Sequence, residues 1–254
     1  MKKTKIDWAD STWNPVTGCL HGCEYCYARA IANRFGWHAN EPDINERVLY
    51  EIPVFDGKKQ PYPFDFAPTF HQYRLGEPAA WTKPRTIFVC SMADLFGKWV
   101  PDEWIKEVFE ACRKAPQHRY LFLTKKPARY IELAEKDILP DDGNMWFGST
   151  TPTPDTEFFF SAGHNTFLSI EPILKPFRDS LGAGIHACEK TDWIIVGAET
   201  GNRKDKVIPE ASWIMELVQC AEETGTPIFM KESLRGIMGD CFRQEFPWEA
   251  SGDD

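Results

Sequence analysis

Short apolar runs of five or six residues recur along the second two-thirds of the chain, separated by more polar stretches. They lie at 86–91, 120–124, 145–149, 167–171, 193–198 and 227–231. Their hydrophobicity is nearly continuous and does not alternate with polar positions. This pattern is typical of parallel strands that are covered on both faces.

Helical periodicity fills several of the gaps between these runs. Apolar residues recur with the spacing i, i+3, i+4, i+7 at Ile105, Val108, Phe109 and Cys112, and again at Ile214, Leu217, Val218 and Ala221. We expect the two helices to begin at Pro101 and Pro209, each followed by an acidic residue that suits the helix dipole. A further helix is expected over 27–37, ending near Gly36.

With a first strand at about 12–18, the chain predicts a β/α repeat of six or seven strands. We therefore expect an α/β fold, a single partial or nearly complete (β/α) barrel over residues 1–254. A chain of 254 residues is long enough to bury such a core as one domain. In sheets of this kind, open or closed, functional groups gather at the carboxyl ends of the strands.

The segment 38–84 interrupts the repeat after the first β/α unit. Its prolines exclude a long regular element: Pro42, Pro53, Pro61, Pro63, Pro68, Pro78 and Pro84. Its aromatic residues are too many for a disordered linker: Phe55, Tyr62, Phe64, Phe66, Phe70, Tyr73 and Trp81. We expect a packed but irregular insertion that covers the barrel mouth or shapes it.

Three cysteines form the spacing Cys-x3-Cys-x2-Cys, at Cys19, Cys23 and Cys26. This spacing places three thiolates on one short loop and leaves a fourth metal position unfilled. A [4Fe-4S] cluster normally takes four thiolates. A cluster held by only three keeps one iron free for a small molecule, and we interpret the loop as such a site.

Two other interpretations of the loop stay open. With His21 or His38 the three thiols would form a closed Cys3His zinc site. His21 lies between two of the cysteines, where reaching the same ion is sterically cramped, and His38 lies beyond the expected helix. A disulfide within the loop would leave one cysteine unpaired. Ligand softness and an open coordination position favour the iron–sulfur cluster.

The charge balance bears on the kind of partner. The chain has 29 basic and 38 acidic residues and a net charge of −9. Proteins that bind nucleic acid nonspecifically usually carry a basic excess or a basic face. A nucleic-acid partner is therefore not favoured, although a local patch can exist within a negative total. The most concentrated basic stretch contains Arg119, Lys125, Lys126 and Arg129. It is either an anion site or the solvated start of a helix.

No feature of the sequence predicts a membrane partner or export. No signal peptide precedes the cysteine loop, and no apolar run reaches the roughly 18 residues that a membrane span needs. The other cysteines show no paired spacing: Cys90, Cys112, Cys188, Cys220 and Cys241. Cys112 and Cys220 lie on apolar helical stripes and are expected to be core thiols. A reducing, cytoplasmic location follows.

Polar residues follow the ends of the predicted strands. Beyond the cysteines, these strand-end positions include Ser91, Asp94, Thr124, Lys125, Ser149, Glu171, Glu199, Lys231 and Glu232. Glu171 and Glu199 each end an apolar strand, where a carboxylate is costly unless it is paired or functional. Because loops are generally polar, this set is enriched in candidate site residues without identifying any one of them.

Five further segments extend the pattern of the cysteine loop. They read WNPVTGC at 13–19, SMADLF at 91–96, LTKKP at 123–127, LSIEP at 168–172 and IVGAETG at 195–201. In the cysteine spacing and in Tyr25 before the third cysteine, the chain resembles the radical S-adenosylmethionine (SAM) superfamily, and the five segments narrow that resemblance. Within it, the chain looks like an uncharacterised radical SAM-type family found in phages and bacteria. The resemblance spans roughly residues 6–235, and GAET at 197–200 departs slightly from the GGES of many members.

The resemblance implies a β/α barrel and two cofactors, a [4Fe-4S] cluster and SAM. Cys19, Cys23 and Cys26 would hold the cluster, and SAM would chelate the fourth iron through its amino and carboxylate groups. An external one-electron donor of the flavodoxin or ferredoxin type would reduce the cluster. The sulfonium carbon–sulfur bond would then break, releasing a 5′-deoxyadenosyl radical that abstracts a hydrogen atom from the substrate.

The resemblance also suggests roles for single residues. Tyr25 would pack beside the adenine, or else serve as a core aromatic. Ser91 and Asp94 stand where the superfamily commonly contacts the amino group of SAM, although an Asp at such a place can instead cap a helix.

At the later strand ends, Glu171 and Glu199 would bind ribose hydroxyls, and Lys125 or Lys231 would meet the SAM carboxylate. The alternative for these four side chains is a salt-bridge network inside the barrel. Gly197 would let the backbone approach a ligand or turn sharply.

The expected function is therefore that of a radical SAM enzyme acting on a small or medium-sized substrate, such as a nucleoside or nucleotide. One alternative is a nucleic-acid repair or modification enzyme, because spore photoproduct lyase shares the cysteine spacing. That enzyme would need a continuous basic surface around the barrel mouth. A second alternative is a noncatalytic metal-binding interaction module, which would show a closed metal site and bind no SAM.

Overall fold

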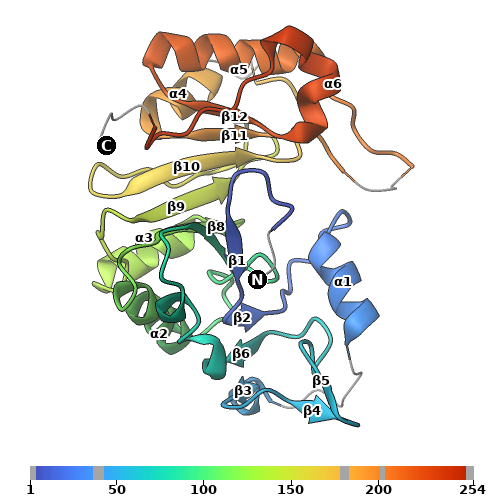
Figure 1. The fold of residues 1–254 in the computed structure, drawn as a ribbon. Coiled ribbons are helices and arrows are strands. Elements are labelled where there is room, and N and C mark those ends of the chain that lie inside the picture. Colours follow the sequence, from blue (N-terminus) through green and yellow to red (C-terminus); the bar gives the residue numbers. More distant parts are fainter. Residues whose placement is uncertain (1–3, 37–42, 178–182, 201–203, 250–254) are drawn as a thin grey trace. The chain divides into compact units, whose positions relative to one another are not determined.

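Every apolar run expected to be a strand forms one in the structure, a computed structural model that describes residues 4–36, 43–177, 183–200 and 204–249 (Figure 1). The strands belong to two compact units, Met1–Pro140 and Asp141–Asp254. Within each unit the strands of the main sheet are parallel and alternate with helices along the chain. The α/β class is thereby confirmed. That the strands form one barrel of the radical SAM type stays a prediction.

The first unit contains three parallel strands in the order β1-β7-β8. These are β1 (Ser11–Trp13), β7 (Thr86–Val89) and β8 (Arg119–Thr124). Helix α2 (Asp102–Arg113) follows β7, and α3 (Ala128–Glu135) follows β8. As expected, α2 begins directly after Pro101 and has two acidic residues in its first turn.

The second unit continues the β/α pattern with four parallel strands in the order β9-β10-β11-β12. These are β9 (Met145–Thr150), β10 (Asn165–Ile170), β11 (Ile194–Val196) and β12 (Ile228–Met230). Its helices are α4 (Ala183–Lys190), α5 (Ala211–Thr224) and α6 (Arg235–Met238). Helix α5 begins one residue later than expected, so Glu210 is its N-cap and its first turn has no acidic residue.

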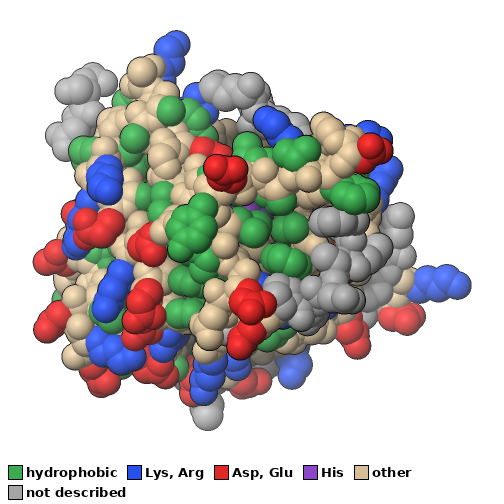
Figure 2. Space-filling view, turned by 90° about the horizontal axis from the view of Figure 1, so that it is seen from below, with side chains coloured by type: hydrophobic (Ala, Val, Ile, Leu, Met, Phe, Trp, Pro, Cys, Tyr) green, Lys and Arg blue, Asp and Glu red, His purple; other side chains and the backbone are tan. Residues whose placement is uncertain are grey.

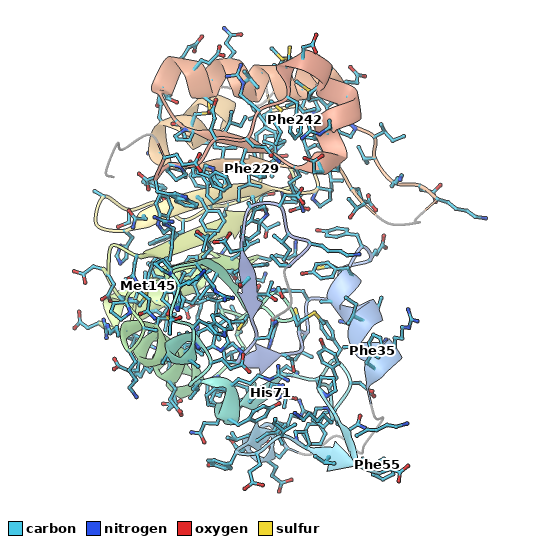
Figure 3. The ribbon with its side chains drawn as sticks, viewed as in Figure 1. Phe35, Phe55, His71, Met145, Phe229 and Phe242 are labelled. Carbon is cyan, nitrogen blue, oxygen red and sulfur yellow. A yellow bond between two sulfur atoms is a disulfide. The ribbon has the colours of Figure 1, made fainter. Side chains whose placement is uncertain are left out.

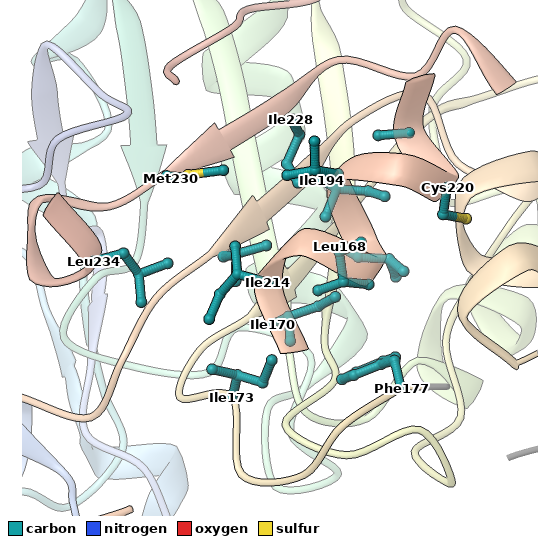
Figure 4. Packing of buried hydrophobic residues seen from close by; sticks show 14 of the residues in the cluster. Leu168, Ile170, Ile173, Phe177, Ile194, Ile214, Cys220, Ile228, Met230 and Leu234 are labelled. Carbon is teal, nitrogen blue, oxygen red and sulfur yellow. The ribbon is translucent and has the colours of Figure 1, made fainter. Parts of the chain in front are cut away.

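Alternate residues of the β10–β12 sheet form the core beneath α5 (Figure 4). Leu168 and Ile170 of β10 share this side with Ile194 of β11, and Ile214 of α5 packs against them. The same core contains Cys220, which was expected to be an unpaired core thiol. That expectation is wrong, because Cys220 of α5 forms a disulfide with Cys188 of α4. The two helices pack together although the cysteines lie 32 residues apart in the sequence.

The expected first strand at 12–18 is wrong as a single element. It divides into β1 and β2 (Val16–Thr17), which belong to different sheets. Asn14 and Pro15 separate them, and a proline has no N–H with which to continue a ladder. Strand β2 pairs instead with β6 (Thr69–His71) in a small sheet that β3 (Val48–Leu49) completes.

The insertion 38–84 is more regular than expected, although residues 38–42 lie outside the described residues. It contributes β3 and β6 to the small sheet and forms the hairpin β4 (Val54–Phe55) and β5 (Lys58–Lys59). The prolines limit each of these strands to two or three residues. Phe55, expected to be packed, is 49 % exposed on the hairpin (Figure 3).

The insertion is joined firmly to the rest of its unit. His71 of β6 is fully buried and shares a hydrogen bond of 2.8 Å with the hydroxyl of Thr17 on β2. Burial lowers the pKa of His71 to about 2, so its ring stays neutral. Phe70 stacks on Trp104 of α2 with 5.2 Å between ring centroids.

Helix α1 (Tyr27–Phe35) ends at Gly36, as expected. The remaining helical elements are short 3-10 turns at Ile44–Glu46, Gln72–Arg74, Pro78–Ala80, Glu232–Leu234 and Gly239–Cys241. Among the helices of the described residues, none has the length and apolar character that a membrane crossing requires.

Candidate functional site

The cysteine loop follows β2 and is fixed at its first residue by Gly18. The backbone of Gly18 has a φ of +89°, a conformation that L side chains rarely adopt. Its N–H donates to the carbonyl of Met92 at 2.9 Å. A Cβ at Gly18 would overlap the carbonyl of Ala67. The backbone at the start of the loop therefore lies directly against the backbone of the insertion.

The insertion forms the floor under the cysteines. The N–H of Cys19 donates to the carbonyl of Phe66 at 3.1 Å, and Cys19 and Cys26 both pack against the small apolar cluster that contains Phe66. The guanidinium of Arg29 lies over the Phe66 ring at 5.0 Å and donates to the carbonyl of Cys19 at 3.3 Å. Within this unit the insertion therefore shapes the surroundings of the cysteine loop.

The three cysteine side chains are half-buried and carry no disulfide. The sulfur of Cys26 accepts the N–H of Arg29 at 3.4 Å, and the sulfur of Cys19 accepts the N–H of His21. Burial, reinforced by the charge of Asp94, raises the pKa of the Cys19 thiol to about 11. At neutral pH Cys19 therefore keeps its proton until a metal displaces it.

Within the described part of the chain, no three His, Cys, Asp or Glu side chains converge closely enough to hold a metal ion as they stand. The donor set itself nevertheless suits an iron–sulfur cluster. Three soft ligands lie on one loop, and two of the sulfurs receive backbone N–H groups. Hydrogen bonds of this kind to sulfur tune the reduction potential of a cluster.

Asp94 connects the cysteine loop to the ends of two strands. Its Oδ2 accepts from His21 Nε2 at 2.7 Å and from the Lys125 N–H at 3.0 Å. Its Oδ1 accepts from the Thr124 hydroxyl at 2.8 Å and from the Phe96 N–H at 3.0 Å. Asp94 is only 5 % exposed. A carboxylate with four donors already in place acts as a support for the loop, which argues against direct contact with the SAM amino group.

The hydrogen bond between His21 and Asp94 also holds the His21 ring in place. Besides Asp94, its ring contacts Trp99 edge-on with 4.8 Å between ring centroids. His21 is thus held by its own partners, which weakens the idea that it closes a Cys3His zinc site with the three thiols. His38, the other candidate for a fourth ligand, lies outside the described residues.

Asn14 is a site residue that sequence reasoning did not single out. Its Oδ1 accepts from the Met92 N–H at 2.9 Å and from the Ser91 hydroxyl at 3.2 Å. Ser91 also accepts, at its carbonyl, a hydrogen bond of 2.8 Å from the hydroxyl of Tyr27 on α1. The available signal was Asn14 within the segment WNPVTGC, where a polar residue separates two buried strands.

Tyr25 and Lys125 contact each other beside the loop, although they are 100 residues apart. The ammonium of Lys125 donates to the Tyr25 hydroxyl at 3.2 Å and lies 5.2 Å from the centre of the ring. The structure therefore brings five kinds of predicted site residue together in the first unit: the cysteines, Tyr25, Ser91, Asp94 and Lys125.

The other predicted site residues form a second group, in the second unit. Glu171 and Lys231 make an ion pair with each other. A Cβ at Gly197 would crowd both of their side chains, so this glycine makes room for the pair and adopts no positive φ. The two expected roles of Gly197, a close approach to a ligand or a sharp turn, stay predictions. Glu199 is buried two residues further along.

The basic stretch does not gather into one patch. Arg119 is the first residue of β8, and Lys125 directly follows its last residue. Arg129 is paired with Asp102 and Glu132. Figure 2 shows acidic and basic side chains interspersed over one face of the molecule, with no broad basic surface on it.

A family model described as "Protein of unknown function (DUF5131)" matches residues 3–238. No curated protein and no solved structure matches the chain.

Proposed function

The chain belongs to the DUF5131 family, described as proteins of unknown function, and for it we propose the activity of a radical SAM enzyme. In this proposal Cys19, Cys23 and Cys26 hold a [4Fe-4S] cluster, and SAM is the second cofactor. The substrate is a small or medium-sized molecule, such as a nucleoside or nucleotide. The strands of both units would belong to one partial (β/α) barrel of the radical SAM type.

The observation that carries the proposal is the support of the cysteine loop. Three half-buried thiols share one loop, and two of the sulfurs receive backbone N–H groups. Asp94 ties this loop to the carboxyl ends of β7 and β8, where parallel sheets place functional groups. A purely structural loop would not need three unpaired thiols at this edge.

When bound, the reduced cluster would supply one electron to cleave the sulfonium bond of SAM and generate the radical that abstracts hydrogen. The chain's own residues would do the remaining work. Asp94 ties the loop to the strand ends through His21, and Asn14 holds Ser91 and Met92 after β7. Phe66 and Met92 cover the inner side of Cys19 and Cys26. The protein thus orients the cofactors and shields the reactive species.

Two partner assignments accompany the proposal. Reduction of the cluster requires an external one-electron donor, of the flavodoxin or ferredoxin type. An oxygen-sensitive cluster also requires a reducing compartment, for which we propose the cytoplasm. The Cys188–Cys220 disulfide lies in the other unit and involves none of the proposed ligands.

The test is anaerobic reconstitution with iron and sulfide, followed by dithionite and SAM, with 5′-deoxyadenosine measured by chromatography. We expect the wild-type protein to develop cluster absorbance and to form 5′-deoxyadenosine. Cys23→Ala should lose both, because two thiolates cannot replace three. Cys241→Ala is the matched control, since Cys241 is an exposed thiol outside the loop.

Three results would contradict the proposal. The wild-type protein could bind zinc in a closed site and take up no cluster, which would favour the interaction module. It could hold a cluster that never cleaves SAM. Finally, Cys23→Ala could form 5′-deoxyadenosine at the wild-type rate, which would separate the activity from the cysteine loop.

A further inference from the structure

The residues around Asp94 offer more hydrogen-bond donors than acceptors. An ionised carboxylate has about four acceptor sites. Asp94 uses them for His21, Thr124, Phe96 and Lys125, the last two through their backbone N–H groups. This buried carboxylate is therefore not available to the other donors beside it.

Three donors lack an acceptor of their own or a counter-ion: the Lys125 ammonium, the Tyr25 hydroxyl and the Trp99 indole. Lys125 Nζ has the Tyr25 hydroxyl as its partner, and a neutral phenol does not neutralise an ammonium group. Because that hydroxyl accepts from Lys125, its own hydrogen remains available. The indole N–H of Trp99, whose ring packs on His21, is buried without a hydrogen-bond partner in the structure as described.

Lys125 is also held in place. Its backbone N–H is bonded to Asp94, and its ammonium lies over the face of the Tyr25 ring. No carboxylate forms an ion pair with it among the described residues, whereas Lys231 of the second unit is paired with Glu171. A half-buried cation without a counter-ion is costly unless a ligand completes it.

We propose that Lys125, positioned by Tyr25, is an anion-binding position beside the cysteine loop. The ligand group is a carboxylate or a phosphate, since both offer several acceptor oxygens to an ammonium and a hydroxyl donor. The identity of that ligand rests on the proposed function. In a radical SAM enzyme the anion is either the carboxylate of SAM or the phosphate of a nucleotide substrate.

The experiment measures binding, by equilibrium dialysis, of SAM, decarboxylated SAM and AMP to the reconstituted protein. Lys125→Met keeps an unbranched side chain only one atom shorter and removes its charge. Lys126→Met is the matched control, because Lys126 is the adjacent lysine and is exposed. Loss of a charge-assisted hydrogen bond should weaken binding by about 10- to 100-fold. Cluster absorbance and thermal unfolding would show that both variants fold and load alike.

The ligands distinguish the two sources of the anion. If the SAM carboxylate is the ligand, Lys125→Met weakens SAM binding and leaves decarboxylated SAM unchanged. If a substrate phosphate is the ligand, AMP binding weakens and SAM binding does not. Tyr25→Phe should weaken the binding of that ligand less than Lys125→Met does, because the aromatic ring still faces the ammonium.

Two outcomes would overturn the inference. Lys125→Met could bind SAM and AMP as tightly as the wild type, or Lys126→Met could weaken them equally, which would indicate a general effect of charge. Should the wild-type protein take up no cluster and bind no SAM, the proposed function fails by itself. The anion position would then depend on AMP: binding that Lys125→Met abolishes supports it, and absence of AMP binding to the wild type contradicts it.

Discussion

Asp94 shows how one buried carboxylate organises a loop that has little regular structure of its own. Each hydrogen bond to a charged group contributes about 1.5–3 kcal/mol, and a buried donor left without its acceptor costs about as much. Asp94 accepts from the loop at His21 and from the strand end at Thr124. The position of the cysteines therefore depends on a residue about 70 positions away in the sequence.

At the same scale, the raised pKa of Cys19 predicts its reactivity in the metal-free protein. The thiolate is the form that reacts with iodoacetamide. Because burial raises the pKa of Cys19 from 9.0 to about 11, its alkylation rate should still be rising steeply between pH 9 and pH 10. The rate at an unstructured reference peptide with one cysteine, added to the same sample, should level off near the ordinary thiol pKa of about 8.5. Peptide mass spectrometry over a series of pH values measures both in one sample.

The pH at which each alkylation rate levels off decides this prediction. Slow access of iodoacetamide to a buried thiol lowers the rate at every pH but does not move the midpoint of the pH profile. A Cys19 profile that levels off together with that of the reference peptide would contradict it. Iron–sulfur reconstitution before alkylation should protect Cys19 and leave Cys241 reactive.

At the scale of elements, the junction between β2 and the cysteine loop leaves no room for a side chain at Gly18. Gly18 and Gly22 both have positive φ, +89° and +71°, but only Gly18 has backbone atoms where a Cβ would lie. Gly22→Ala should cost about 1 kcal/mol of unfolding free energy, from backbone strain. Gly18→Ala should cost roughly 1–3 kcal/mol more, because the loop must move away from Ala67.

Urea unfolding of the two variants beside the wild type measures this difference. The pair shares loop, residue type and backbone conformation, so the contrast isolates the close approach to the insertion. Equal destabilisation of both variants would mean that the insertion yields easily to the added methyl group.

The insertion itself shows why element-scale patterns need tertiary structure to be interpreted. Its prolines keep every strand short, as the sequence indicated, but short strands still pair when a neighbour supplies the edge. Strand β2 is the neighbour of β6, and it is available only because Asn14 and Pro15 separate it from β1.

At the scale of the whole molecule, the acidic total governs nonspecific association. With a net charge of −9, and with basic residues dispersed among acidic ones on the face that Figure 2 shows, we expect little counterion release on contact with a duplex. Fluorescence anisotropy with a labelled duplex of about 20 base pairs, at about 150 mM salt, should show a dissociation constant above about 100 µM.

Low-micromolar binding that weakens steeply with salt would contradict this expectation and favour the nucleic-acid repair alternative. A nucleotide such as AMP tests a different property, because a single phosphate can be held by a few donors without a basic surface.

Much of the fold followed from local pattern. Strand β10 was predictable because the run at 167–171 is mostly apolar and does not alternate with polar positions. Helix α2 was predictable because its apolar residues share one helical stripe that begins after Pro101. The cysteine loop was predictable from spacing alone, since three thiols within eight residues must lie on one loop.

The composition of the site was less accessible. Asn14 and Thr124 carry no chemistry of their own and matter only for the groups that fold against them. The two candidate lysines could not be distinguished by sequence, because each follows an apolar strand. Only the folded chain pairs Lys231 with Glu171 and leaves Lys125 facing a tyrosine.

The sequence by itself therefore determined the α/β class, the positions of β7 to β12 and of α1, α2 and α5, and the three clustered thiols, because hydrophobic periodicity and short spacings act between near neighbours. Tertiary structure decided the division of the first strand, the pairing of Cys188 with Cys220, and the partners of Asp94 and Lys125. Those contacts join residues tens of positions apart, and their energies depend on burial and geometry that no local pattern contains.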